Sequence, residues 1–245
     1  MATRLFSRRN AWLLGAVGFC WLLAVALYPV SNELTRAAGA GLAGAMTLAL
    51  LGLAWPRRWA RWTLLGLYSA AACFVALPGR TTYDRPALRR EIARAATRYE
   101  GVRYVRGGEN FLGIDCSGLV RRATVDGMFS YGVRTLNPWL VRRAAAFWWN
   151  GRSAREMGAG AGGTAHKVAE TKSLRLWNDK NLHPGDFAIT AGGVHALLYL
   201  GEHIWLEADP AAMKVVRLRT ERDRNPWLET PVSVLRWRFL ELPAR

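Results

Sequence analysis

The chain divides into an apolar front and a mixed remainder. Three uncharged stretches, residues 11–30, 37–55 and 62–78, precede a region in which charged and apolar residues alternate. Each stretch approaches the ~20 apolar residues that a helix needs to cross a bilayer, although the third reaches only the lower end of that range. The pattern predicts a membrane domain over residues 1–80 with three transmembrane helices. The third stretch can alternatively be a tilted partner or an interfacial helix.

The first stretch also has features of a cleaved signal peptide, because arginines precede it and small residues such as Ala24 and Ala26 lie inside it. Two anchors would remain after cleavage. Basic residues set the expected orientation, since they gather before the first stretch and between the second and third, at Arg4, Arg8, Arg9, Arg57, Arg58 and Arg61. By the positive-inside bias these segments are cytoplasmic, so the domain after residue 78 is expected to face outward.

Residues 81–245 show helical patterns first and strand patterns second. From Pro86 apolar residues recur at helical spacing, and Gly101 is typical of a helix end. A second helix is predicted from Asp115 or Cys116 to about Gly127. Residues 128–181 are of mixed character and are interpreted as an insertion, with a helical stretch, a flexible glycine run and an edge element over residues 173–181.

From His183 the pattern becomes that of short strands, rich in β-branched and aromatic residues and separated by turn residues. Strands are predicted over residues 186–190, 193–200, 203–208, 213–219 and 232–239. Helices followed by an antiparallel meander predict an α+β domain over residues 81–245.

The formal net charge is +16, a balance that attracts polyanions. Nucleic acid is not the predicted partner, because the sequence shows no zinc-ligand spacing, no stacking motif of the RNA-binding type and no basic helix with base-reading residues. Anionic lipid headgroups or acidic wall polymers suit an outward-facing domain better. The alternative is an arginine-rich surface that is simply solvated. No metal-ligand cluster or nucleotide-binding loop is visible, so no cofactor is predicted.

Cys116 is the candidate nucleophile. Cys20 and Cys73 lie inside apolar stretches, where cysteine behaves as a small hydrophobic residue, so Cys116 is left unpaired. It lies between an acidic residue and a Ser-Gly pair, where a turn gives way to a helical pattern. The N-terminus of a helix stabilises a thiolate. A lone thiol is a liability in an oxidising compartment unless it is used, which favours a catalytic role.

A thiol nucleophile needs a base and a group that orients that base. Of the four histidines, His195 alone lies in the middle of a predicted strand, whereas His203 lies at the start of one, near a turn. If the next hairpin has an odd-numbered loop centred on Gly201, His195 lies directly opposite Glu207, with ~4.5–5.5 Å between their Cβ atoms. A two-residue turn would instead put the two on opposite faces of the sheet. Tyr104 is a candidate for stabilising an oxyanion.

Each of these four residues also has an ordinary structural interpretation: a buried free cysteine, a core or surface histidine, a solvated glutamate and a packing tyrosine. The sequence as a whole carries a resemblance that bears on this choice. The segment GVRYVRGGENFLGIDCSGLV, residues 101–120, resembles the nucleophile segment of NlpC-type cell-wall endopeptidases. HPGDFAIT and GGVHALLYLG resemble that family's Pro-Gly-Asp strand and its histidine strand, and IWLEADP resembles the strand that bears a third polar residue.

The resemblance covers roughly residues 86–210 and implies a papain-like fold in a cysteine peptidase that hydrolyses amide bonds of peptidoglycan stem peptides. It implies Cys116 as nucleophile, His195 as base, Glu207 as orienting residue and Tyr104 as an oxyanion or positioning partner. The sequence departs from the family in three ways. Glutamate stands where His, Asn or Gln is more common, the interval between cysteine and histidine is long, and Arg106 occupies a position that is often aromatic.

The leading hypothesis is therefore a multi-pass cysteine hydrolase of the bacterial inner membrane, with its catalytic domain on the extracytoplasmic side and peptidoglycan peptides and the lipid bilayer as partners. One alternative is a thiol acyltransferase or amidase that acts on lipid-linked substrates. Another is a catalytically silent domain that binds the cell wall.

Overall fold

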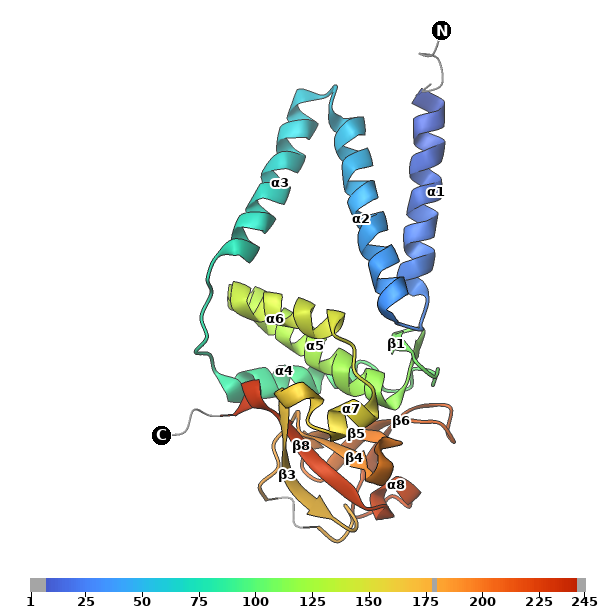
Figure 1. Cartoon of the computed structure of the whole chain (residues 1–245), viewed down its shortest axis with the longest axis vertical. Coiled ribbons are helices and arrows are strands. Elements are labelled where there is room, and N and C mark those ends of the chain that lie inside the picture. Colours follow the sequence, from blue (N-terminus) through green and yellow to red (C-terminus); the bar gives the residue numbers. More distant parts are fainter. Residues whose placement is uncertain (1–7, 178–179, 242–245) are drawn as a thin grey trace.

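Three long helices project from one end of an α+β domain in the computed structural model, which describes residues 8–177 and 180–241 (Figure 1). They are α1 (Arg8–Leu27), α2 (Glu33–Ala54) and α3 (Arg58–Ala76). Asn32 begins α2 with a capping box, in which its side chain accepts from the Thr35 N–H and the Thr35 hydroxyl accepts from the Asn32 N–H. Arg4, one of the residues used to predict the orientation, lies outside the described residues.

Within the described part of the chain, α2 is the one helix that is long and apolar enough to cross a membrane. A shorter apolar stretch, Gly15–Val25, lies in α1. α3 begins with charged residues and ends at Ala76, so only residues 62–76 of the expected third span are both helical and uncharged, short of the ~20 that a bilayer requires. The prediction of three full spans is thus not confirmed. A single such helix near the N-terminus is also what a signal sequence looks like.

The helices of the domain are α4 (Arg85–Thr97), α5 (Cys116–Arg134) and α6 (Pro138–Trp149), with the short α7 (Ala154–Gly158) and α8 (Pro226–Glu229). The predicted end of the second helix at Gly127 is wrong, because α5 continues for two further turns. At Gly127 the helices α4 and α5 cross so closely that a Cβ atom would lie 2.6 Å from the Ile92 side chain. This glycine permits close packing and does not stop the helix.

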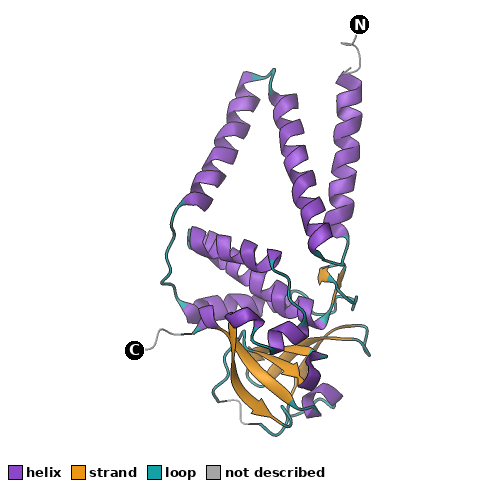
Figure 2. Cartoon of the chain, in the orientation of Figure 1, coloured by secondary structure: helices purple, strands orange, loops and turns teal. Residues whose placement is uncertain are grey.

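The strands form a six-stranded antiparallel sheet in the order β3-β8-β4-β5-β6-β7. Their bounds are β3 (Ala165–Thr171), β4 (Phe187–Thr190), β5 (Ala196–Gly201), β6 (Ile204–Asp209), β7 (Lys214–Arg219) and β8 (Val232–Trp237), and a separate ribbon pairs β1 (Glu109–Asn110) with β2 (Gly113–Ile114). Figure 2 shows the helices α4, α5 and α6 gathered on one side of the sheet. The predicted α+β class with an antiparallel sheet is confirmed. The edge strand of the insertion, however, is β3, and the described residues of the expected edge element, 173–177 and 180–181, join no strand.

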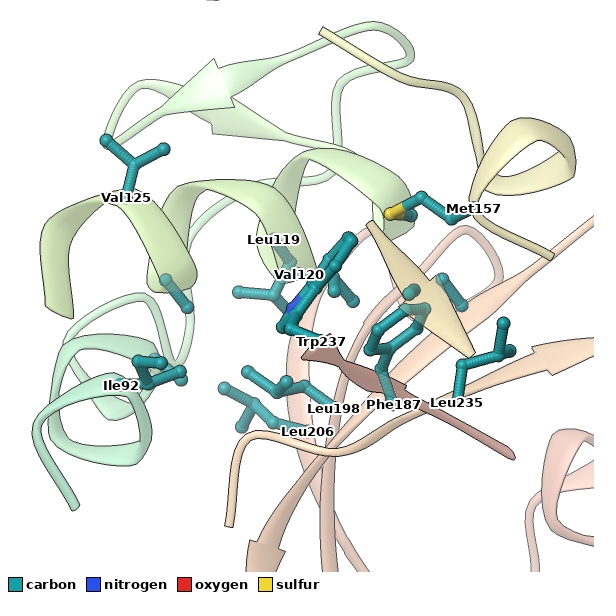
Figure 3. Close-up of a cluster of buried hydrophobic side chains, with 14 of the residues drawn as sticks. Ile92, Leu119, Val120, Val125, Met157, Phe187, Leu198, Leu206, Leu235 and Trp237 are labelled. Atoms are coloured by element: carbon teal, nitrogen blue, oxygen red, sulfur yellow. The ribbon is translucent and has the colours of Figure 1, made fainter. Parts of the chain in front are cut away.

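The main core lies between these helices and one face of the sheet, and Figure 3 shows side chains from both layers meeting there. Its labelled members are Ile92, Leu119, Val120, Val125, Met157, Phe187, Leu198, Leu206, Leu235 and Trp237. A second cluster covers the opposite face and includes Leu197, Trp205 and Leu228, with Trp227 of α8 packed against it. α5 is thereby held against the middle strands of the sheet, which brings its first residue close to the beginning of β5.

Candidate active site

Cys116 is the first residue of α5, and the turn before it is locked onto the helix. The Asp115 carboxylate accepts hydrogen bonds from the Gly118 N–H (2.6 Å), the Ser117 hydroxyl (2.9 Å) and the Gly107 N–H (2.7 Å). Asp115 is therefore the N-cap of α5 and also the anchor of the preceding turn. The thiol is buried at the positive end of the helix, where a thiolate is stabilised.

The β5–β6 hairpin differs from the expected geometry in its turn length and in its register. The two differences cancel in their effect on which face of the sheet carries His195 and Glu207. Its turn has two residues, Glu202 and His203, both with positive φ (53° and 60°), as a type I′ turn requires. Such a turn alone would have placed His195 and Glu207 on opposite faces. A register shift between Tyr199 and Gly201 restores the match, so that Leu198 pairs with Leu206 and Tyr199 with Trp205.

In that register Glu207 is not directly opposite His195 but two residues along the neighbouring strand, a diagonal position on the same face. A long side chain can still reach across this distance. β5 begins at Ala196, so His195 lies just before the strand and not within it as predicted. The Thr190 hydroxyl accepts from the His195 N–H at 2.9 Å, and the Thr190 N–H donates to the His195 carbonyl at 3.0 Å. These bonds hold the backbone of His195 to the end of β4.

His195 and Glu207 are in direct contact. Nε2 of the imidazole lies 2.6 Å from Oε2 of Glu207, and the side chains are 2% and 0% exposed. Because Glu207 engages Nε2, Nδ1 is the remaining ring nitrogen, and the Cys116 side chain lies near enough to the ring to raise the pKa of His195. Sulfur, imidazole and carboxylate therefore converge, as the resemblance implies.

The electrostatics of the site favour a protonated imidazole. Burial acts to lower the pKa of His195, but the hydrogen bonds and charges of Cys116 and Glu207 outweigh it and raise that pKa to about 9. At neutral pH the ring is therefore an imidazolium, the partner that stabilises a cysteine thiolate. Burial raises the pKa of Glu207, while its hydrogen bonds with His195 and Asn225 act in the opposite direction.

Tyr104 lies close enough to Cys116 for the charge of the sulfur to affect the pKa of the Tyr104 hydroxyl. Its pKa is raised by partial burial and by the charges of Cys116 and Asp115, so its hydroxyl is protonated and can donate a hydrogen bond at neutral pH. The Tyr104 N–H donates to the Met213 carbonyl at 2.9 Å, and Tyr104 forms a parallel bridge with Ile114. All four residues singled out from the sequence thus lie in one region, and their catalytic roles remain predictions.

The other histidines lie elsewhere. Nε2 of His166 contacts Glu241 at 2.8 Å. Burial lowers the pKa of His183, and the neighbouring charges of Arg236 and Arg89 lower it further. The His203 N–H donates to the Tyr199 hydroxyl in the hairpin turn. The choice of His195 among the four therefore agrees with the geometry.

Two residues of the site were missed by the sequence analysis. The Asn225 side chain donates to Oε1 of Glu207 at 2.8 Å, and the Trp227 ring stacks on His195 with centroids 4.2 Å apart and planes at 20°. Asn225 also caps α8, accepting from the Trp227 N–H at 2.9 Å. The available signal was the Asn-Pro-Trp-Leu sequence at residues 225–228, a helix start that recurs at residues 137–140, where Asn137 caps α6.

Comparison with known proteins gives structural matches alone. No protein-family model matches the chain, and no curated protein matches it. Among solved structures it is similar to NlpC2 from Trichomonas vaginalis, with 18% identity, a TM-score of 0.40 and coverage of 64% of this chain and 49% of that one. It thus spans about half the length of that protein.

Two further solved structures are similar. RipB, a peptidoglycan hydrolase from Mycobacterium tuberculosis, has 22% identity and a TM-score of 0.40, with coverage of 85% of this chain and 92% of that one. The NlpC/p60 domain of the peptidoglycan hydrolase SagA has 19% identity and a TM-score of 0.33, with coverage of 60% and 97%. NlpC2 and the SagA domain carry the NlpC or NlpC/P60 name, the same type that the sequence segments resemble.

Proposed function

We propose that this chain is a cysteine hydrolase that cleaves amide bonds in peptidoglycan stem peptides. The observation that carries the proposal is the buried contact of His195 with Glu207, next to a cysteine at the N-terminus of α5. A nucleophile, a base and a group that orients the base form the arrangement that acyl transfer through a thioester requires. The peptide substrate is the part of the proposal that comes from the resemblance of residues 101–120 and of the histidine strand.

The proposed reaction begins with attack of the Cys116 thiolate on the amide carbon. The negative charge that forms on the carbonyl oxygen is stabilised by the Cys116 N–H in the first turn of α5 and by the Tyr104 hydroxyl. The His195 imidazolium gives its proton to the leaving amine as the C–N bond breaks and a thioester remains. The neutral imidazole then takes a proton from water and the hydroxide attacks the thioester. The C–S bond breaks to return the thiolate, and the carboxylic acid that leaves gives its proton to solvent.

We also propose that α2 crosses a bilayer with α1 and α3 beside it. The three helices expose apolar side chains that a soluble protein would bury, among them Phe19, Trp21, Leu48, Leu50, Trp62 and Leu67. Arg57, Arg58 and Arg61 lie at the α2–α3 turn, the end of the helices that points away from the sheet (Figure 1). A cytoplasmic turn would place the α+β domain outside the cytoplasm.

The hydrolase proposal is tested with the full chain in detergent micelles, incubated with defined muropeptides and followed by mass spectrometry of the products. We expect a pair of fragments that differ from the substrate by one added water, and their loss in Cys116→Ala and His195→Ala. Both variants should keep the far-UV circular dichroism of the parent chain. Binding of muropeptides without any cleavage would instead indicate a silent wall-binding domain.

One observation favours a second candidate, a thiol acyltransferase or amidase that acts on lipid-linked substrates. Phe111 and Leu112 form the tip of the β1–β2 ribbon and are 53% and 51% exposed. The ribbon adjoins the end of α1, because the Asn110 side chain donates to the Leu27 and Tyr28 carbonyls at 3.3 and 3.0 Å. An apolar tip next to the proposed membrane helices suits a lipid surface. Cleavage of acylated lipids, with muropeptides left intact, would decide for this candidate.

A further inference from the structure

One buried carboxylate connects α2 with the nucleophile helix. Glu109, in β1, is 3% exposed. Its Oε2 accepts from Nη2 of Arg36 in α2 at 2.7 Å, and its Oε1 lies 3.4 Å from Nη2 of Arg121 in α5. The helix that is the candidate membrane span and the helix that begins with Cys116 are therefore held by the same side chain.

The Arg36 guanidinium occupies a site formed by several segments and is 5% exposed. Its Nε donates to the Ser31 hydroxyl at 2.9 Å, and its Nη1 donates to the Trp149 carbonyl at the end of α6, also at 2.9 Å. Gly151 lies so close that a Cβ atom there would be 2.4 Å from Nη1. An arginine with this many directed partners fixes the position of α2 more narrowly than apolar contact would.

The connector between α1 and α2 (residues 28–32) also binds the turn that precedes the nucleophile. The Glu109 N–H donates to the Pro29 carbonyl at 2.8 Å, and the Ser31 N–H donates to the Gly107 carbonyl at 3.0 Å. Val30 and Gly108 form an antiparallel bridge between these bonds. The connector thus acts as an added strand along the turn.

The same turn holds the N-cap of α5. The Gly107 N–H donates to the Asp115 carboxylate at 2.7 Å, and the Asp115 N–H donates to the Gly108 carbonyl at 3.1 Å. An unbroken path of hydrogen bonds therefore runs from the connector through Gly107 and Gly108 to Asp115, which sets the first turn of α5 and with it the thiol. Displacement of the hairpin formed by α1 and α2 would release this path at its outer end.

We propose that Arg36 is a positioning residue for Cys116: docking of the α1–α2 hairpin through Arg36 and Glu109 holds the nucleophile turn in its reactive geometry. The consequence for turnover rests on the hydrolase function proposed above, whereas the consequence for the thiol does not. Loss of Arg36 leaves Glu109 with the longer 3.4 Å contact to Arg121, and Arg121 does not replace the bonds that Arg36 makes to α6 and the connector.

The test measures alkylation of Cys116 by iodoacetamide in the full chain in detergent micelles, with the Cys116 peptide quantified by mass spectrometry so that Cys20 and Cys73 do not contribute. We expect Arg36→Ala to slow alkylation about tenfold or more, because small displacements of reacting groups have effects of this size. Arg36→Lys should recover part of the rate.

The matched control is Arg217→Ala, which removes an Arg–Glu pair of the same 2.7 Å length, formed with Glu100 at the surface, where the two side chains are 38% and 42% exposed. Its alkylation rate should equal that of the parent chain. If Arg36→Ala does not fold, as judged by circular dichroism, Glu109→Gln removes the charge at constant shape and should slow alkylation in the same direction.

An equal or faster rate in the folded Arg36 or Glu109 variants, or an equal slowing in Arg217→Ala, would overturn the proposal. Failure of the parent chain to cleave any peptide would count against the hydrolase function and leave the alkylation result intact, so the two proposals fail separately.

Discussion

Nε2 of His195 lies 2.6 Å from Oε2 of Glu207, and the second oxygen of that carboxylate accepts from Asn225 at 2.8 Å. Both oxygens of the Glu207 carboxylate therefore have a partner: Oε2 contacts the imidazole ring, and Oε1 accepts from the residue that begins α8. The Trp227 ring of α8 stacks on one face of the imidazole. The ring is consequently fixed by contacts on its edge and on its face, with Nδ1 left for the sulfur.

Replacement of Glu207 by glutamine tests the charge of this contact at constant shape. We expect Glu207→Gln to lower kcat about 10²–10⁴-fold, the range that positioned acid–base groups contribute. The physical reason is that an amide stabilises the imidazolium less than a carboxylate does, so the pKa of His195 should fall from about 9. Steady-state kinetics on muropeptides and an NMR titration of the ring protons give the two readouts. An unchanged titration of His195 in the variant would show that the carboxylate does not carry the effect.

The raised pKa of His195 also predicts how stability depends on pH. The folded value of about 9 lies above the ordinary value of 6.5, so the ring contributes its full stabilisation below pH 6.5. Between pH 6.5 and 9 the unfolded state releases the proton while the folded state keeps it. The free energy of unfolding should fall over this window by on the order of 3 kcal/mol.

Chemical unfolding of the full chain at a series of pH values measures this fall, and His195→Ala serves as the reference because it removes the titrating group. The curve of the variant should be flatter between pH 6.5 and 9. Parallel curves for the two proteins would contradict the assignment of the raised pKa to His195.

The two Asn-Pro-Trp-Leu segments offer a matched pair of substitutions. Asn225 and Asn137 both begin a helix with a side-chain cap, but only Asn225 contacts Glu207. Each change to alanine should lower the free energy of unfolding by about 1 kcal/mol, the usual cost of a lost N-cap. Asn225→Ala should in addition lower kcat/KM, because Oε1 of Glu207 loses its partner. Equal activity losses in Asn137→Ala and Asn225→Ala would mean that the effect is one of stability alone.

The strands from β4 onward could be predicted because they are short runs rich in β-branched and aromatic residues, separated by turn residues. β4 to β8 each lie within two or three residues of the expected ranges. β3 was missed, because this edge strand carries His166, Lys167 and Glu170 and so lacks an apolar alternation. The predicted edge element over residues 173–181 contains apolar positions, yet Leu174 lies in the second core cluster and Trp177 packs against it, and neither joins a strand.

The residues that lie together at the candidate site could be predicted from the sequence, but their geometry only in part. His195 and Glu207 were expected on the same face of the sheet because of an odd-numbered loop centred on Gly201. The hairpin has a two-residue turn instead, and a register shift after Tyr199 puts the two residues on the same face. A shift of this kind depends on the packing of the whole sheet and leaves no local signal. Asn225 reaches Glu207 because the chain returns to β6 through α8, a tertiary contact that spacing along the sequence does not encode.

Gly118 provides a last test, at the point where the nucleophile turn meets α5. A Cβ atom at Gly118 would lie 2.2 Å from the Gly108 carbonyl oxygen, a backbone atom that cannot move without displacing the turn. Alanine is favoured over glycine inside helices by about 1 kcal/mol, so propensity alone would predict a gain in stability. We expect Gly118→Ala instead to destabilise the domain by about 1–3 kcal/mol through overpacking and to slow the alkylation of Cys116.

Gly66→Ala, in α3, is the control, since a Cβ atom there meets nothing within 4 Å. Thermal unfolding of both variants measures the difference, and a Gly118→Ala protein as stable and as reactive as the parent would show that the turn can shift without consequence for the thiol.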